Sequence, residues 1–174
     1  MRFTNRFFHF LAMASILVGA TAAAAGPSGA IFTTNATGTF VNGNVYDAPE
    51  EVYLNGGPRA NQRCTSAGLP DGWYIFRVTD PSGHVELTEL ATDDRILRVE
   101  NGIVKEYPGT RNTGVGRCND LTVALSPFGA TPNPGGEYKV WLTPIDLLGN
   151  FDFHPSNSKT DNFKVVPADT DPPD

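Results

Sequence analysis

The chain has 174 residues and an acidic composition, with 13 lysines and arginines against 19 aspartates and glutamates, which gives a formal net charge of −6. Nucleic-acid binding depends on basic patches that lie over phosphates, so this balance argues against nucleic acid as a partner and also against anionic membrane surfaces. The 18 glycines and 14 prolines are scattered between short apolar runs, which is typical of an all-β protein.

The first 25 residues have the pattern of a secretory signal peptide. Arg2 and Arg6 precede an apolar run over residues 7–19, and the alanines at 22–25 supply the small residues that cleavage requires. The run is short for a bilayer span, which needs about 20 apolar residues. We therefore expect a secreted or extracellular protein with no membrane insertion after cleavage.

The rest of the chain is expected to form one domain. Residues 26–166 have the length of a single β-sandwich, which is long enough to bury a core without a metal. Residues 167–174 are rich in proline and aspartate and have no apolar face, so we expect a disordered tail or a linker there.

Short apolar runs with alternating pattern predict the strands. The expected strands cover residues 30–33, 39–41, 44–46, 52–54, 73–79, 85–90, 95–99, 103–107, 121–125, 137–143 and 162–166. Asn101-Gly102 favours a type I′ hairpin, and Asp80–Gly83 fits a type I turn. A single helical turn is expected near Thr143–Leu148, and long loops are expected over 55–71 and 107–120.

A short phrase occurs twice in the sequence. Gly72–Thr79 and Gly136–Thr143 share the pattern Gly-x-Tyr-x-apolar-x-apolar-Thr, which predicts two strands that each have one face on the core. The expected core positions are Tyr74, Phe76, Val78, Tyr138, Val140 and Leu142. Both tryptophans, Trp73 and Trp141, fall on the opposite faces.

The outward tryptophans allow two interpretations. Trp73 and Trp141 could form an aromatic platform for sugar rings, because an indole combines a large apolar face with a polar N–H. Alternatively, a crossing loop such as 55–71, or another chain, covers them. Ile75 beside Trp73 favours the cover, since a contiguous exposed apolar patch is unfavourable.

The two cysteines, Cys64 and Cys118, lie in the two expected long loops. Outside the cytoplasm an isolated pair usually forms a disulfide, and no Cys-x-x-Cys motif or neighbouring histidine indicates a metal site or a catalytic thiol. We expect a Cys64–Cys118 disulfide, which stabilises the fold by roughly 4 kcal/mol in the chain-entropy model.

No catalytic pattern stands out in the sequence. His84 and His154 read as exposed loop residues, and neither a Gly-x-Ser-x-Gly nor a His-Glu-x-x-His motif is present. Carboxylates are numerous enough to leave a carboxylate-based hydrolase as a weaker alternative. No cofactor is expected, although residues 146–152 and 161–162 leave a structural calcium possible.

Residues 69–80, Leu-Pro-Asp-Gly-Trp-Tyr-Ile-Phe-Arg-Val-Thr-Asp, resemble the Pro-x-Gly-x-Tyr-x-apolar-x-Val phrase of prealbumin-like β-sandwich domains, which include the Cna-B and SdrD B-like repeats of bacterial surface adhesins. Residues 52–58, 131–136 and 159–164 are similar to phrases of a poorly characterised group of secreted bacterial proteins. The resemblance implies a stalk, spacer or adhesive module at a bacterial cell surface or in the periplasm. The first lysine is Lys105, so the early strands offer no amine for the Lys–Asn cross-link of many Cna-B domains.

These observations predict a single all-β domain, an immunoglobulin-like or prealbumin-like antiparallel β-sandwich. Its expected function is that of a non-catalytic extracellular structural or adhesive module, with a cell-surface protein or a polysaccharide as partner. A carbohydrate-binding module with an aromatic platform is the alternative.

Overall fold

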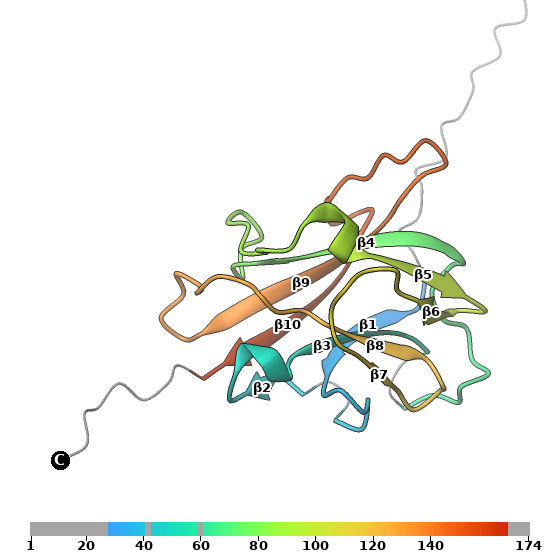
Figure 1. Ribbon diagram of the computed structural model, residues 1–174, viewed down its shortest axis with the longest axis horizontal. Coiled ribbons are helices and arrows are strands. Elements are labelled where there is room, and N and C mark those ends of the chain that lie inside the picture. Colours follow the sequence, from blue (N-terminus) through green and yellow to red (C-terminus); the bar gives the residue numbers. More distant parts are fainter. Residues whose placement is uncertain (1–27, 41–42, 59–60, 167–174) are drawn as a thin grey trace, which may run out of the picture.

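The computed structural model describes residues 28–40, 43–58 and 61–166 (Figure 1). The expected signal peptide and the expected tail lie outside these residues. The described chain forms two packed β-sheets and contains no α-helix, which confirms the prediction of an all-β sandwich. No helix in this part of the chain is long and apolar enough to cross a membrane.

The larger sheet has six strands in the order β2-β10-β9-β4-β5-β6. Their bounds are Val45–Tyr46 for β2, Lys159–Val165 for β10, Glu137–Pro144 for β9, Gly72–Thr79 for β4, Ile96–Glu100 for β5 and Ile103–Glu106 for β6. All neighbours pair antiparallel except β2, whose two residues run parallel to β10.

The smaller sheet has four antiparallel strands in the order β1-β3-β8-β7. Their bounds are Ala30–Thr34 for β1, Tyr53–Gly57 for β3, Leu121–Ala124 for β8 and Thr113–Val115 for β7. Two single-turn 3-10 helices, η1 (Pro49–Glu51) and η2 (Thr92–Arg95), lie in connections between strands.

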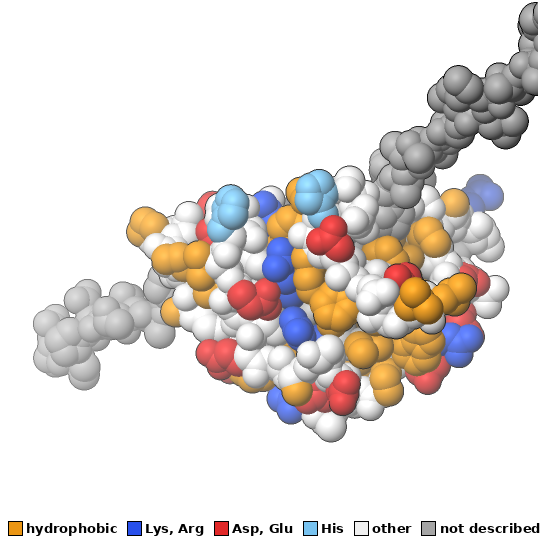
Figure 2. Space-filling view, turned by 90° about the horizontal axis from the view of Figure 1, so that it is seen from above, with side chains coloured by type: hydrophobic (Ala, Val, Ile, Leu, Met, Phe, Trp, Pro, Cys, Tyr) orange, Lys and Arg blue, Asp and Glu red, His pale blue; other side chains and the backbone are white. Residues whose placement is uncertain are grey.

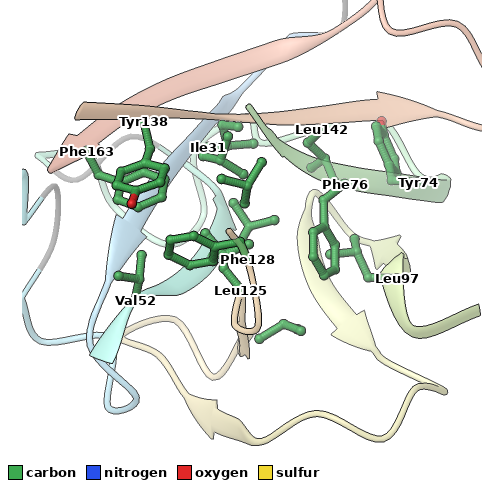
Figure 3. Close-up of a cluster of buried hydrophobic side chains, with 14 of the residues drawn as sticks. Ile31, Val52, Tyr74, Phe76, Leu97, Leu125, Phe128, Tyr138, Leu142 and Phe163 are labelled. Carbon is green, nitrogen blue, oxygen red and sulfur yellow. The ribbon is translucent and has the colours of Figure 1, made fainter. Parts of the chain in front are cut away.

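The two strands with the shared phrase, β4 and β9, are direct neighbours in the larger sheet. Phe76 pairs with Leu142 and Val78 pairs with Val140. All six positions that the alternation assigned to the core are buried, as predicted. They belong to one buried cluster with side chains of the smaller sheet and its connections, part of which Figure 3 draws. Burial of such side chains stabilises the fold by about 1.5–3 kcal/mol each.

An aromatic cluster fills one end of the core (Figure 3). The rings of Tyr138 and Phe163 stack with centroids 5.2 Å apart, and Phe128 meets both rings edge-on at 5.1 and 5.7 Å. Such arrangements stabilise aromatic pairs by about 0.5–1.5 kcal/mol beyond their burial. The cluster therefore fastens β9, β10 and the connection after β8 to one another.

Several strand predictions were wrong. Residues 85–90 do not form a strand. They make only two isolated bridges, Glu86 with Thr79 and Thr88 with Phe128, and we call this segment the strap. Residues 39–40 belong to a turn held by Asn35, whose Oδ1 accepts the backbone N–H groups of both.

Two other predictions about local structure were also wrong. The helical turn expected near 143–148 is absent, since β9 continues to Pro144. The strand β7 falls inside the expected loop 107–120.

The two predicted turns have the expected geometry. Asn101 and Gly102 both have positive φ angles, 52° and 80°, as a type I′ hairpin between β5 and β6 requires. In the second turn the N–H of Gly83 donates to the carbonyl oxygen of Asp80 at 3.0 Å. The Asp80 carboxylate accepts further hydrogen bonds from the N–H groups of His84 and Val85.

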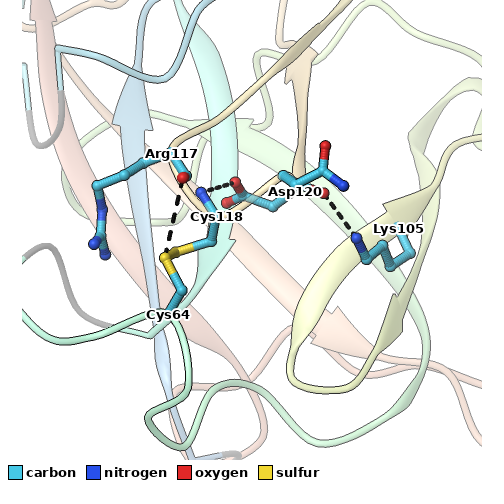
Figure 4. Close-up of a disulfide and its surroundings, with 6 residues drawn as sticks. Cys64, Lys105, Arg117, Cys118 and Asp120 are labelled. Carbon is cyan, nitrogen blue, oxygen red and sulfur yellow. Dashed lines mark hydrogen bonds between the residues drawn. A yellow bond between two sulfur atoms is a disulfide. The ribbon is translucent and has the colours of Figure 1, made fainter.

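Cys64 and Cys118 lie at disulfide distance, as predicted, with their sulfurs 2.14 Å and their Cα atoms 5.3 Å apart (Figure 4). The pair joins the connection between β3 and β4 to the turn between β7 and β8. That turn is itself fixed by Asp120, whose Oδ1 accepts the Cys118 N–H at 2.9 Å. Lys105 of β6 donates to the carbonyl oxygen of Asn119 at 2.7 Å and holds the turn from the other side.

Candidate ligand-binding groove

The outer face of the larger sheet places the two tryptophans in different environments. Trp141 of β9 is only 5% exposed. Its Nε1 donates to the Thr79 hydroxyl at 3.0 Å. The turn at Gly83 lies directly on the indole, so closely that a Cβ at Gly83 would come within 2.6 Å of Cζ2 of Trp141. Trp141 is therefore part of a covered layer.

Arg77 of β4 completes the cover. Its guanidinium carbon lies 5.0 Å from the Trp141 ring centre and 4.4 Å from that of Phe153, so it sits close to both aromatic rings. Glu86 holds the guanidinium through a 3.4 Å contact. Phe153 belongs to the β9–β10 connection and Glu86 to the strap after β4. The turn at Gly83 and the side chains of Arg77 and Lys139, rather than the expected loop 55–71, supply the contacts over Trp141, while Phe153 and Glu86 hold Arg77 in place.

Trp73, at the start of β4, stays 39% exposed. It pairs with Arg98 of β5, whose guanidinium carbon lies 5.7 Å from the indole centre. Trp141 instead pairs with Arg77, four residues further along β4. Four residues of a strand span roughly 13 Å, at about 3.3 Å each. The favoured interpretation, a cover, therefore holds for Trp141, while Trp73 remains exposed, and the alternative of one platform formed by both tryptophans is not supported.

A groove with a volume of about 500 Å³ opens beside Trp73. One wall comes from residues 70–74, and the other comes from the end of β9 and the β9–β10 connection. Phe151, which is 41% exposed, adds a second aromatic side chain. The polar side chains that line it are Asp71, Thr143, Asp146, Asn150, Asp152, Ser156 and Asn157. We call this the Trp73 groove; its volume is within the range of about 300–1,000 Å³ that is typical of ligand sites.

One wall of the groove is a turn organised by Asp146. Its Oδ1 accepts the backbone N–H groups of Leu148 and Asn150, and its Oδ2 accepts the Asn150 side-chain amide at 3.1 Å. These hydrogen bonds, chiefly those from Asn150, lower the pKa of the Asp146 carboxyl. The carboxylate is thus held in its ionised form, and Leu147 and Leu148 are exposed at the tip of the turn.

The facing wall is also fixed by hydrogen bonds. Asp71 Oδ1 accepts the N–H of Gly102 at 3.0 Å, which ties the wall to the β5–β6 hairpin. The Tyr74 hydroxyl donates to the carbonyl oxygen of Pro70 at 2.7 Å, and burial, with a smaller effect of Asp71, raises the pKa of Tyr74 to about 12. The backbone of Trp73 is held by the N–H of Ile145 at 2.8 Å. These contacts hold the walls in place, so the groove is preformed.

Neither histidine lines the Trp73 groove, although His154 contacts Ser156, which does. Both are exposed, and pale-blue histidine side chains are visible on the face drawn in Figure 2. Nδ1 of His84 contacts the Ser82 hydroxyl at 3.0 Å, and Nδ1 of His154 contacts the Ser156 hydroxyl at 2.8 Å. A catalytic triad needs the second imidazole nitrogen to work with a carboxylate partner. Among the described residues, neither imidazole makes a hydrogen bond or ion pair with a carboxylate; each contacts a serine hydroxyl instead.

The acidic segments that left a calcium site open do not come together. Asp146 lines the Trp73 groove, whereas Asp161 lies against Thr33 of β1, where burial raises the pKa of its carboxyl. Among residues 28–40, 43–58 and 61–166, no group of three or more histidine, cysteine, aspartate or glutamate side chains could hold a metal ion.

Sequence reasoning identified Trp73 but missed its partners in the groove. Phe151 and Asp152 sit in a polar connection with no strand pattern, and Asp71 looked like a turn residue. The one available signal was the aromatic pair Phe151 and Phe153 within an otherwise polar loop. The chain matches no protein-family model, and comparison with curated proteins and with solved structures found no match.

Proposed function

We propose that the domain is a non-catalytic extracellular module that adheres to a cell-surface component through the Trp73 groove. The observation that carries the proposal is the difference in solvent exposure among the aromatic side chains on this side of the larger sheet. Trp141 is buried beneath the Gly83 turn and Arg77, while Trp73 and Phe151 stay about two-fifths exposed around a preformed groove. Exposed apolar surface rimmed by polar side chains is typical of a binding site.

An extracellular location fits the rest of the molecule. The N-terminal sequence has the signal-peptide pattern, and Cys64 and Cys118 lie at disulfide distance. Disulfides persist in oxidising compartments, and a disulfide-bonded all-β domain is compatible with secretion. The resemblance of residues 69–80 to adhesin repeats supports the adhesive role.

A polysaccharide is favoured as the ligand by the composition of the groove. The C–H face of a pyranose ring packs on an aromatic side chain, as Trp73 and Phe151 could provide. Carboxylates and amides such as Asp152 and Asn157 accept from or donate to several hydroxyls at once. The proposed carbohydrate site therefore pairs Trp73 with Phe151, and Trp141 serves as buried support.

A carboxylate-based hydrolase is less well supported. General acid catalysis of glycoside hydrolysis needs a carboxyl whose pKa is raised. The pKa of Asp146 is lowered instead, and its two oxygens accept the hydrogen bonds that build the turn. Asp71 and Asp152 are likewise engaged with Gly102 and Asn157. These carboxylates have structural roles in the groove.

The test is binding to a broad panel of polysaccharides and to intact cells, with the wild-type protein and Trp73→Ala. Loss of an aromatic anchor from a binding site should weaken attachment by about tenfold or more. Phe40→Ala is the control, because Phe40 is also an exposed aromatic residue but lies outside the groove. Binding that survives Trp73→Ala unchanged would overturn the proposal, as would a hydrolytic activity that a single aspartate replacement abolishes.

A further inference from the structure

We infer that the Trp73 groove selects saccharides that carry no carboxylate or sulfate groups. This inference rests on the proposed carbohydrate binding and adds the class of ligand. Three carboxylates line the groove, those of Asp71, Asp146 and Asp152, and no lysine or arginine is among the described residues that line it. An anionic sugar would enter a site that has negative charge on both walls.

The carboxylates have free capacity for hydroxyl groups. An ionised carboxylate offers about four acceptor positions. Asp71 uses Oδ1 for the Gly102 N–H, and Asp152 uses Oδ2 for the side-chain amide of Asn157. The remaining positions on both side chains can accept hydrogen bonds from sugar hydroxyls, which donate readily. A uronate or sulfate group offers hydrogen-bond acceptors but no donor. It would place a second negative charge against the carboxylate oxygens of Asp71 and Asp152.

The arginine that packs on Trp73 does not compensate for these carboxylates. Arg98 packs on Trp73, but it belongs to β5, on the opposite side of β4 from the groove wall that β9 supplies. It is also engaged by two carboxylates, Glu100 at 2.7 Å and Glu106 at 3.4 Å. Arg98 therefore orients the indole and adds no net positive charge to the groove.

Electrostatic repulsion sets the difference in affinity between neutral and anionic polymers. Like charges a few ångströms apart in a half-exposed groove repel measurably, although solvent and salt screen the effect. We expect a uronate polymer to bind at least about tenfold more weakly than the neutral polymer of the same linkage. Most of the difference should disappear at about 1 M salt, where the screening length is roughly 3 Å.

The experiment compares matched polymers. The probes are a glucan, a mannan and a galactan, each beside the same polymer with its primary hydroxyls oxidised to carboxylates. Affinities are measured at low and high salt for the wild type and for Asp71→Asn/Asp152→Asn. The amides keep an oxygen for Gly102 and Asn157, so the fold should persist, and near-ultraviolet circular dichroism checks this.

The wild type should prefer the neutral member of every pair that binds. The double variant should reduce the ratio of the affinities for the neutral and the oxidised polymer by about threefold to tenfold, because it removes two of the three negative charges. Equal affinity for both members of a pair, with both dependent on Trp73, would leave the proposed function standing and overturn the charge selection. Preference for the oxidised member would also overturn it. Failure of every polymer to bind would overturn the carbohydrate function itself.

Discussion

The Asp161 carboxylate of β10 accepts the backbone N–H of Thr33 in β1 at 2.8 Å and thereby joins the larger sheet to an edge strand of the smaller one. The Thr33 hydroxyl lies 3.3 Å from the same oxygen. Without this contact the N–H of an edge strand would lack a partner at this position. The carboxylate is partly withdrawn from water there, and desolvation raises its pKa despite the bonds from Thr33.

The raised pKa predicts how Asp161 affects stability. An acid whose pKa is higher in the folded state subtracts stability when it is ionised, and that loss is relieved as the pH falls through the folded pKa. Asp161→Asn should therefore stabilise the fold near pH 7 and make no difference below about pH 4, where the unfolded carboxyl is also protonated. Urea denaturation at several pH values measures both regimes.

Asp161→Ala provides the contrast. It removes the acceptor and leaves the Thr33 N–H without a partner, which should lower the free energy of unfolding by about 1–3 kcal/mol near neutral pH. If the asparagine and alanine variants behave alike, the hydrogen bond between the sheets has no energetic importance and our description of this contact is wrong.

Gly83 and Gly149 separate backbone strain from contact with Trp141. Both have φ angles near +84°, so an alanine should cost about 1–2 kcal/mol at either site. Only at Gly83 would the new Cβ also meet the indole, at 2.6 Å, whereas nothing lies within 4 Å at Gly149. Gly83→Ala should therefore be the more destabilising and should expose Trp141 to acrylamide quenching.

Chemical denaturation and fluorescence of the two glycine variants measure these effects. Equal losses of stability at Gly83 and Gly149 would mean that the turn yields without disturbing the indole. The cover over Trp141 would then be looser than the contacts around it indicate.

The aromatic cluster should carry a large share of the core's stability. Phe163→Ala removes the stacked partner of Tyr138 and opens a cavity beside Phe128, which should cost about 3–5 kcal/mol. Phe40→Ala, at a half-exposed ring, should cost far less. Urea denaturation of both variants compares them, and a similar loss for the two would place the centre of the core elsewhere.

The cysteine pair is tested by mass and by stability. Alkylation of the intact protein without reductant should leave its mass unchanged, because neither thiol of Cys64 or Cys118 is free. Replacing both by serine should reduce the free energy of unfolding by about 2–4 kcal/mol. Addition of two alkyl groups to the unreduced protein would contradict the disulfide.

The sequence was sufficient for the core strands and not for the groove. Alternation in Gly72–Thr79 and Glu137–Pro144 predicts their buried faces because side chains in a strand point to opposite sides. The strand β7 was missed since its three residues, Thr113–Val115, are too few for a pattern. The pattern of residues 85–90 predicted a strand, but the Thr88 hydroxyl accepts the hydrogen bond of the Val78 N–H at 2.7 Å, where a regular strand pair would use a backbone carbonyl.

The groove depends on contacts between segments that are distant in sequence. Trp73 carries an obvious signal, but Phe151 and Asp152 join it in the groove only because the β9–β10 connection lies beside residues 70–74. Local pattern likewise could not show that Gly83 would lie on Trp141. Identical residue types, both on outer strand faces, thus acquired different roles through loops whose paths the sequence did not reveal.

The central claim is that ligands contact Trp73 while Trp141 remains a buried support. Because the chain has only two tryptophans, the indole N–H signals of an isotope-labelled protein report on both sites, with Trp73→Phe assigning them. Titration with the polysaccharides that bind should shift the Trp73 signal and leave that of Trp141, bonded to Thr79, in place. Binding that moves only the Trp141 signal, or neither signal, would contradict the account.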